Sequence, residues 1–276
     1  MLGLGASLLS PYVEGVAPYS NTKSIEFDGT GDHVRTYPDN SDTLKEILSG
    51  SPTAGKGFTI SAWINSDFNS SSNFYGISAG GTTGISLQLL NNNIGGFIRL
   101  LQLQIRHSNT FNQTLTIGAD YYEGGTVKWE HIVLVFKIDD SSPAANASLT
   151  AYRNGGVEIT NTSCADFQTL EAGAPSGSGT FDLANVTFVI GGVDLTTGTT
   201  STSACKMDEF AIFNTHLTIA EVQEIYNSGA PADLTTHSKA DNLVNYYRFE
   251  DDVTDTQGNQ DGSAQGDPTF STNVPS

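Results

Sequence analysis

Basic residues are scarce in this chain of 276 residues. Lys and Arg total 12 against 30 Asp and Glu, which gives a formal net charge of −18 and a pI near 4.3. Binding to duplex DNA or to an anionic membrane needs clustered Lys and Arg, so we expect neither nucleic acid nor a membrane as a partner. Cations, neutral glycans and other proteins remain as candidates.

Long apolar runs and cysteines are also few. The apolar start, MLGLGASLLSPYVEG, is too short to cross a bilayer and has no positively charged region before it, so we expect neither a signal peptide nor membrane insertion. The two cysteines, Cys164 and Cys205, permit one disulfide or two free, partly buried thiols, and they show no C-x-x-C metal pair.

The residues that are abundant favour strands and turns. Gly, Ser, Thr, Asn and aromatics are common, and short apolar or alternating runs recur between them. Predicted strands cover Ser24–Phe27, Phe58–Ile64, Ile85–Leu90, Phe97–Ile105, His131–Ile138, Ser148–Arg153, Val186–Ile190 and Met207–Phe213. The run IVLVF predicts a strand buried on both faces, whereas ISLQL alternates like a half-exposed strand, and two packed sheets would give both patterns.

A hairpin and a helix have clear local signals. Asn154-Gly155 predicts a tight turn between two antiparallel strands within Ala151–Asn161. A helix is predicted over Thr218–Ser228, with Thr218 and Glu221 as a capping box and Gly229 as the C-terminal cap. Its apolar face consists of Leu217, Val222 and Ile225.

Three regions follow from this pattern. Residues 1–20 are predicted to be an N-terminal arm that pairs with a neighbouring chain or is disordered. Residues 21–230 form the main domain, and residues 231–276 form an extension with one strand-like run, Leu243–Phe249, and an acidic tail.

Several runs, in their order, resemble the laminin-G-like, concanavalin-A-like family of jelly-roll lectins and glucanases. The resemblance rests on SIEFDGTGDHV at 24–34, FTISAWINS at 58–66, WEHIVLVFK with LTAYRNGGVE at 129–158, and MDEFAIFNTHLTIAEVQEIYNSG at 207–229. It implies an all-β, antiparallel, two-sheet jelly-roll sandwich with one short helix near its C-terminal side. The two ends, MLGLGASL and NLVNYYRFED with the Asp- and Gly-rich tail, are similar to laminin-G-like virion proteins of marine tailed phages.

The resemblance also implies a structural calcium ion, which the family often holds near the opening turn and the closing strand. Asp28 and Asp32 in the turn and Asp208 and Glu209 in the strand are the expected ligands. The alternative is that Asp28 caps a turn and Asp208 faces water.

Glycan binding needs aromatic platforms and amide or carboxylate groups on loops or on a concave sheet. Residues of these types at loop-like positions are Asn73, Tyr75, Asn92, Tyr121 and Tyr122. Trp63 and Trp129 lie inside apolar strands and are expected to be core residues. His131 is expected to be a satisfied core residue beside Trp129.

Catalysis is not expected. Glucanases of this fold use alternating carboxylates on one strand, and no Glu-x-Asp-x-Glu triplet occurs here. We therefore expect a non-enzymatic virion surface protein, a capsid decoration or fibre-like component, that contacts other virion proteins or its own copies and adheres to host glycans. A free carbohydrate-binding module or adhesin is the alternative, and a glycoside hydrolase is the least favoured.

Overall fold

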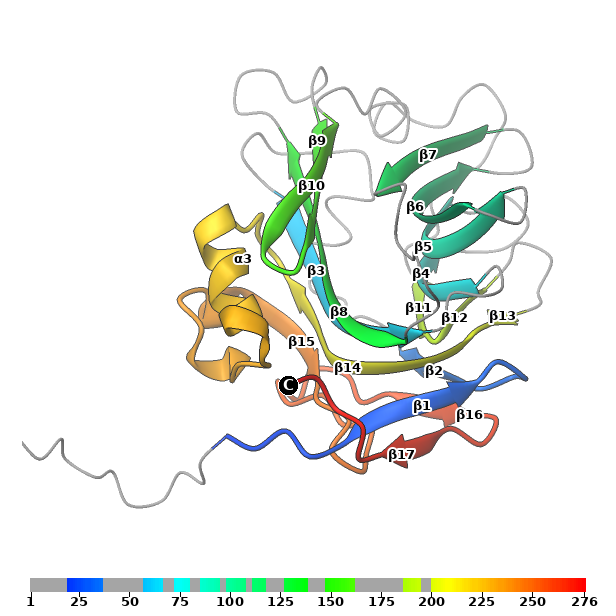
Figure 1. Ribbon diagram of the computed structural model, residues 1–276, viewed down its shortest axis with the longest axis vertical. Helices are drawn as coiled ribbons and strands as arrows, with labels where there is room; N and C mark the ends of the chain where they lie inside the picture. Colours follow the sequence, from blue (N-terminus) through cyan, green and yellow to red (C-terminus); the bar gives the residue numbers. More distant parts are fainter. Residues whose placement is uncertain are drawn as a thin grey trace, which may run out of the picture.

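The computed structural model describes residues 19–36, 57–66, 72–79, 85–94, 98–107, 111–117, 127–138, 147–161, 186–194 and 200–276, and for the strands between 72 and 117 it describes the backbone pairing. The described strands form an antiparallel sandwich of two sheets (Figure 1). The eight-stranded sheet contains, in spatial order, β10 (Gly156–Asn161), β9 (Ala147–Arg153), β8 (Lys128–Ile138), β3 (Gly57–Ser66), β14 (Ala204–Phe213), β1 (Ser24–Asp28) and β17 (Thr269–Ser271), with β15 (Leu243–Tyr247) also paired to β14. This arrangement confirms the predicted all-β, two-sheet jelly roll.

The second sheet has seven strands. Its spatial order is β16 (Ser263–Gln265), β2 (His33–Thr36), β11 (Val186–Ile190), β4 (Ser72–Ala79), β5 (Ile85–Ile94), β6 (Ile98–His107) and β7 (Phe111–Ile117). A small hairpin pairs β12 (Gly192–Asp194) with β13 (Thr200–Thr202). The predicted strands coincide with β1, β3, β5, β6, β8, β9, β11 and β14.

The central strand β8 is buried on both faces, as its continuous apolar run predicts. All five residues of IVLVF, from Ile132 to Phe136, are at most 5% exposed. Val133 and Val135 belong to a cluster with Val222 and Ile225 of the helix α3 (Ile219–Tyr226), so one face of β8 packs on the helix. Figure 1 shows α3 outside the eight-stranded sheet, which therefore lies between the second sheet and the helical layer.

The two tryptophans have different surroundings. Trp63 is 3% exposed and is a core residue, as expected. Trp129 is only half-buried, and its indole N–H donates to Asn273 Oδ1 at 3.1 Å. His131, expected as a core residue beside Trp129, is fully buried, and its ring contacts that of Trp63 at an interplanar angle of 33°, with centroids 4.9 Å apart. The antiparallel register explains the contact with Trp63, because it places His131 opposite Trp63 and Trp129 opposite Asn65.

The helix begins as predicted and ends earlier. Thr218 and Glu221 form both hydrogen bonds of the capping box, and Val222 and Ile225 are buried. The left-handed cap is Asn227, with φ of 45°, and not Gly229, because the chain continues through a 3-10 turn, η4 (Asn227–Gly229). Asn accepts a left-handed conformation, so it can end the helix two residues before the glycine.

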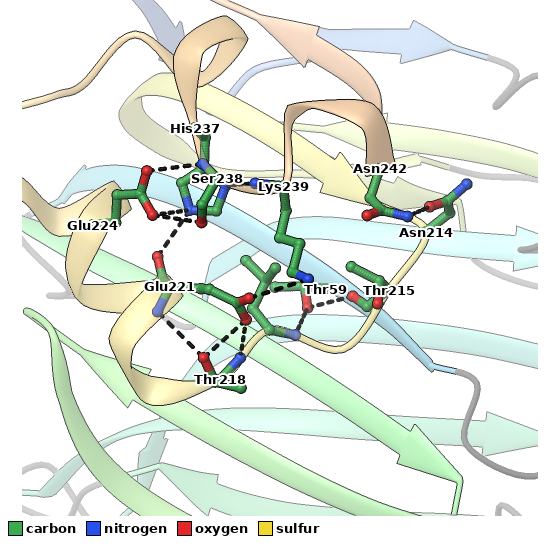
Figure 2. Close-up of polar contacts among 11 residues, drawn as sticks. Thr59, Asn214, Thr215, Thr218, Glu221, Glu224, His237, Ser238, Lys239 and Asn242 are labelled. Atoms are coloured by element: carbon green, nitrogen blue, oxygen red, sulfur yellow. Dashed lines mark hydrogen bonds and ion pairs between the residues drawn. The ribbon is translucent and has the colours of Figure 1, made fainter.

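The chain after the helix is bound back onto it through polar contacts (Figure 2). Ser238 donates its backbone N–H and its hydroxyl to the Glu224 carboxylate, at 2.8 and 2.6 Å. The His237 ring lies 3.0 Å from the Glu221 carbonyl oxygen, and Lys239 Nζ lies 3.4 Å from Glu221 Oε1. These contacts fix the two 3-10 turns η5 (Leu234–Thr236) and η6 (Ala240–Asn242) beside α3.

Residues 231–276 are part of the sandwich. The predicted run Leu243–Phe249 contains β15, which pairs with β14, and the following residues contribute β16 to the seven-stranded sheet and β17 to the eight-stranded sheet. The sequence predicted one strand in this extension, because β16 and β17 have three residues each and no periodic pattern. Residues 1–18 of the predicted arm lie outside the described residues.

Cys205 is a free, buried thiol, and Cys164 lies outside the described residues. Within the described part of the chain, no helix has the length and apolar character that crossing a bilayer requires.

Candidate functional site

The four acidic residues of the predicted calcium site do not surround one point. β1 and β14 are adjacent, as expected, but their register pairs Asp28 with Ala204. Asp208 is four residues further along β14, about 13 Å away at the usual rise of a strand. The opening turn and the closing strand therefore carry two separate acidic pairs.

Asp28 and Asp32 act within the opening turn. Asp28 Oδ1 accepts the backbone N–H of Thr30 at 2.6 Å, which is the turn-capping alternative. Asp32 is buried, and its two carboxylate oxygens accept the backbone N–H groups of Asp28 at 3.2 Å and of Asp267 at 2.8 Å. These bonds join the turn to the segment between β16 and β17.

Asp208 and Glu209 are brought together by a β-bulge. Relative to β3, the pairing shifts between Asp208 and Ala211, so that two residues of β14 oppose one residue of β3. Glu209 has a left-handed φ of 50°. Consecutive strand residues normally belong to opposite faces, and the bulge removes this alternation. Both carboxyl groups are consequently buried, with 0% and 3% exposure.

Residues before β1, within β15 and directly after β15 contact this carboxyl pair. Asn21 Nδ2 donates to Asp208 Oδ2 at 3.0 Å, and the Tyr246 hydroxyl donates to Glu209 Oε2. Arg248 Nε lies 3.5 Å from Glu209 Oε1. The site thus joins three parts of the chain that are far apart in sequence.

Burial raises the pKa of both carboxyl groups of the pair. Burial, together with the charge of Glu209, raises the pKa of Asp208 to about 9. Burial also raises the pKa of Glu209 to about 7, although the Tyr246 hydroxyl and Arg248 oppose the increase. Without a cation, Asp208 therefore holds a proton at neutral pH.

The donor atoms fit part of a calcium shell. Asn21 Oδ1 is buried and accepts no hydrogen bond, and neither does Glu209 Oε1, which lies 3.5 Å from Arg248 Nε. Amide and carboxylate oxygens are the ligands that calcium prefers, but the ion takes six to eight of them. In the described ranges, no group of three or more His, Cys, Asp and Glu residues is arranged to hold a metal ion. Asn21, Asp208 and Glu209 thus supply a partial shell.

The predicted glycan-binding residues lie in strands where the structure describes them, and not in loops. Asn73 and Tyr75 belong to β4, and Asn92 belongs to β5. Tyr121 and Tyr122 lie outside the described residues.

The register of the seven-stranded sheet identifies its inner face. Phe188 of β11 is fully buried and contacts Phe210 of the other sheet, with ring centroids 5.1 Å apart. The same row continues through Ile77, Leu87 and Ile105. The next inner row contains Ile190 and Tyr75, so Tyr75 stands at a core-facing register position.

The alternate positions form a polar outer face over β5, β6 and β7. One row aligns Gln88, Gln104 and Thr114, and the next aligns Ser86, Arg106 and Asn112. We call these six residues the polar face; Gln102 and Thr116 extend it by one more pair. Asn73 pairs with Leu90 and Asn92 pairs with Leu100, so both belong to the same side of the sheet.

This face was not recognised in the sequence, because only the alternation of β5 was noted. The strand β7 was not predicted, and alignment across strands depends on register, which no single strand reveals.

A family model described as the concanavalin A-like lectin/glucanases superfamily matches residues 28–223. The chain belongs to this superfamily. No curated protein sequence matches the chain. Residues 231–276, with their three strands, lie beyond the part that this superfamily model matches.

Solved structures resemble the chain at low sequence identity. A candidate carbohydrate-binding protein from Bacteroides ovatus ATCC 8483 is 18% identical with a TM-score of 0.57, over 94% of this chain and 62% of that chain. A heptameric pentraxin from Limulus polyphemus is 16% identical with a TM-score of 0.45, over 75% and 82% of the two chains. The enzymatically active domain of tailspike protein 2 from bacteriophage CBA120 is 15% identical with a TM-score of 0.45, over 87% and 35%. This chain thus spans less than two thirds of the Bacteroides protein, and the likeness to that protein shows the fold alone.

Proposed function

We propose that this protein binds glycans through the polar face of its seven-stranded sheet. The observation that carries the proposal is the alignment of amide and hydroxyl residues across β5, β6 and β7. Amides and hydroxyls both donate and accept hydrogen bonds, which matches the hydroxyl groups of sugars. The Bacteroides protein of the same fold, named as a candidate carbohydrate-binding protein, supports the proposal, although a fold alone does not fix a function.

We further propose that binding occurs without catalysis. Hydrolysis of a glycosidic bond ordinarily uses two carboxyl groups that flank the bond. The sequences of β4, β5, β6 and β7 contain no Asp or Glu, so the polar face offers no such pair. Incubation with β-glucans is expected to release no reducing sugar.

The proposed setting is the surface of a virus particle, where the protein contacts other virion proteins or its own copies and presents the sandwich to host glycans. The similarity of both chain ends to laminin-G-like virion proteins supports this setting. Detection of the protein in purified particles tests it, and absence from such particles would leave a free carbohydrate-binding module or adhesin.

A glycan array with the purified protein tests the binding. We expect a defined set of glycans to bind. The double variant Gln88→Ala/Gln104→Ala should bind them roughly 5- to 150-fold more weakly, because two lost hydrogen bonds at about 0.5–1.5 kcal/mol each cost about 1–3 kcal/mol. Gln265→Ala is the matched control, since Gln265 is exposed on β16, at the opposite edge of the same sheet.

Either of two results would contradict the proposed site. An array without signal, with and without calcium, would exclude glycan binding of this kind. Equal loss of binding in Gln265→Ala and in the double variant would place the site elsewhere.

We also propose that calcium binds Asp208 and Glu209 with Asn21 and stabilises the fold. An ion that binds only the folded state raises the melting temperature, by roughly 5–10 °C when calcium is about 100-fold above its Kd. We expect this increase in the wild type and its loss in Asp208→Asn, measured by differential scanning calorimetry with calcium and with a chelator. Asp28→Asn, in the separate turn, should keep the increase; no calcium-dependent shift in the wild type would overturn the proposal.

A further inference from the structure

The strands of the polar face have an unusual charge for this protein. The chain carries 30 acidic residues and a net charge of −18, yet from residue 68 to residue 119 the sequence contains no Asp or Glu. The same stretch contains Arg99, Arg106 and His107. The sheet from β4 to β7 is therefore the one long part of the sequence in which the sign of the charge is reversed.

The strand register places the two arginines of β6 on opposite faces of the sheet. Arg106 is aligned between Ser86 of β5 and Asn112 of β7, on the polar face. Arg99 is aligned with Asn93 of β5. Because positions 99 and 106 differ by an odd number of residues, they belong to opposite faces of the strand. Arg106 is accordingly the charged residue of the polar face.

The residue types aligned with Arg106 suit an anionic group of a ligand. Arg106 is aligned with a hydroxyl residue, Ser86, and an amide residue, Asn112, and the neighbouring row of the polar face contains Gln88 and Gln104. A guanidinium group binds a carboxylate through two parallel hydrogen bonds, and such charge-assisted bonds are about twice as strong as neutral ones. No acidic residue of the four strands competes with a ligand for Arg106.

We propose that the glycan bound by the polar face contains a uronic acid, whose carboxylate Arg106 binds. The proposal rests on the proposed function, since it names the class of sugar that the same face takes. One arginine matches one carboxylate in a repeating unit, whereas polysulfates and nucleic acids need clusters of Lys and Arg. The acidic remainder of the protein repels long polyanions, so a short oligosaccharide is the appropriate ligand for a test.

The experiment compares two matched probes, tri-galacturonic acid and its methyl ester, which differ in the charge of the carboxyl groups. Binding is measured by isothermal titration calorimetry for the wild type, Arg106→Gln and Arg99→Gln. We expect the wild type to bind the acid at least ten-fold more tightly than the ester. Arg106→Gln should weaken the binding of the acid at least ten-fold and the binding of the ester much less, so that the preference for the acid is lost. Arg99→Gln should keep the preference of the wild type.

A second variant distinguishes the loss of the guanidinium contact from a folding defect. Arg106→Lys keeps the charge but has no guanidinium fork, so it should retain only a small part of the preference for the acid. Circular dichroism of each variant checks that the sheet is intact.

The negative results have different meanings for the uronic acid inference and for the proposed glycan binding. Equal binding of acid and ester, unchanged by Arg106→Gln, would overturn the inference and leave the proposed glycan binding standing. Tighter binding of a sulfated trisaccharide than of the uronate would also overturn it. Absence of binding to both probes, while an array detects neutral glycans, would overturn the inference alone; an array without signal would overturn the proposed function as well.

Discussion

At the scale of single residues, His131 is a fully buried titratable side chain. Its ring centroid lies 4.9 Å from that of Trp63 and 5.9 Å from that of Tyr226, and these two rings are 5.8 Å apart, so the three rings form a triangle. His131 Nε2 lies 2.9 Å from the Ser61 hydroxyl. Its Nδ1 has no hydrogen-bond partner, so the expected core histidine is only half satisfied. Burial lowers the pKa of His131 to about 3, and the folded protein therefore keeps this ring neutral.

His131 should make the protein sensitive to mild acid. The folded pKa of about 3 lies below the unfolded value of about 6.5, so the unfolded chain takes up a proton that the folded chain cannot. The contribution of His131 to the free energy of unfolding is therefore fully present above about pH 6.5. It decreases by up to about 1.4 kcal/mol per pH unit as the pH falls toward 3.

Urea unfolding at pH 7.5, 6.5, 5.5 and 4.5 measures this effect. The wild type should lose more stability between pH 6.5 and 4.5 than His131→Gln, whatever the difference between the two at pH 7.5. Parallel curves for the two proteins would show that His131 is accessible to protons in the folded state.

At the scale of elements, the hairpin of β9 and β10 shows how a short motif fixes a sheet edge. Asn154, in the turn, has a left-handed φ of 49°, and its backbone N–H donates to the His131 carbonyl oxygen at 2.9 Å. Its side chain accepts the His131 backbone N–H at 2.9 Å and donates to Glu130, which Arg153 also binds at 2.9 Å. Burial alone would raise the pKa of Glu130, but these partners and Lys128 hold it below its ordinary value.

Substitutions at Asn154 should separate the side-chain bonds from the backbone conformation. Asn154→Gly keeps the left-handed φ but removes both side-chain bonds, with an expected cost of about 2–3 kcal/mol. Asn154→Ala should cost about 1 kcal/mol more, because alanine is strained at this φ. The free energy of unfolding in urea checks both values; equal stabilities of the two variants would contradict the contribution of the left-handed turn.

These elements also explain what the sequence could and could not predict. Long strands such as β3, β8 and β14 and the capped helix α3 were predicted, because their patterns are local and periodic. The neighbours of Asp208 could not be predicted, because the bulge at Glu209 breaks the alternation and Asn21 and Arg248 come from distant parts of the chain. The polar face needed the register of β7 as well as the alternation of β5.

At the scale of the whole molecule, the chain after residue 230 completes the core. Leu234, Leu243 and Tyr246 are buried in the cluster that lies between α3 and the eight-stranded sheet. Tyr247 and Phe249 are also buried, and the Phe210 ring lies 6.3 Å from that of Tyr247. Five buried side chains of this size contribute roughly 10 kcal/mol, which is comparable with the net stability of a domain.

A chain that ends at residue 230 should therefore not fold, although it contains the whole part that the superfamily model matches. We expect it to lack the cooperative thermal transition of the full chain in calorimetry and to aggregate. A chain shortened only by residues 274–276 is the control and should melt within a few degrees of the full chain. A cooperative transition of the 230-residue chain at an unchanged temperature would show that the last strands are dispensable.

The late strands have a consequence for protein synthesis. β1 and β2 are among the first strands to be made, whereas their edge partners β17 and β16 are made last. At about 5–20 residues per second, a ribosome needs roughly 10–50 s to extend the chain from Asp28 to Thr269. During that interval the nascent chain exposes two unpaired strand edges, which are templates for pairing with other chains. The protein is therefore expected to depend on chaperones while it is being translated, and to misassemble when many ribosomes produce it close together.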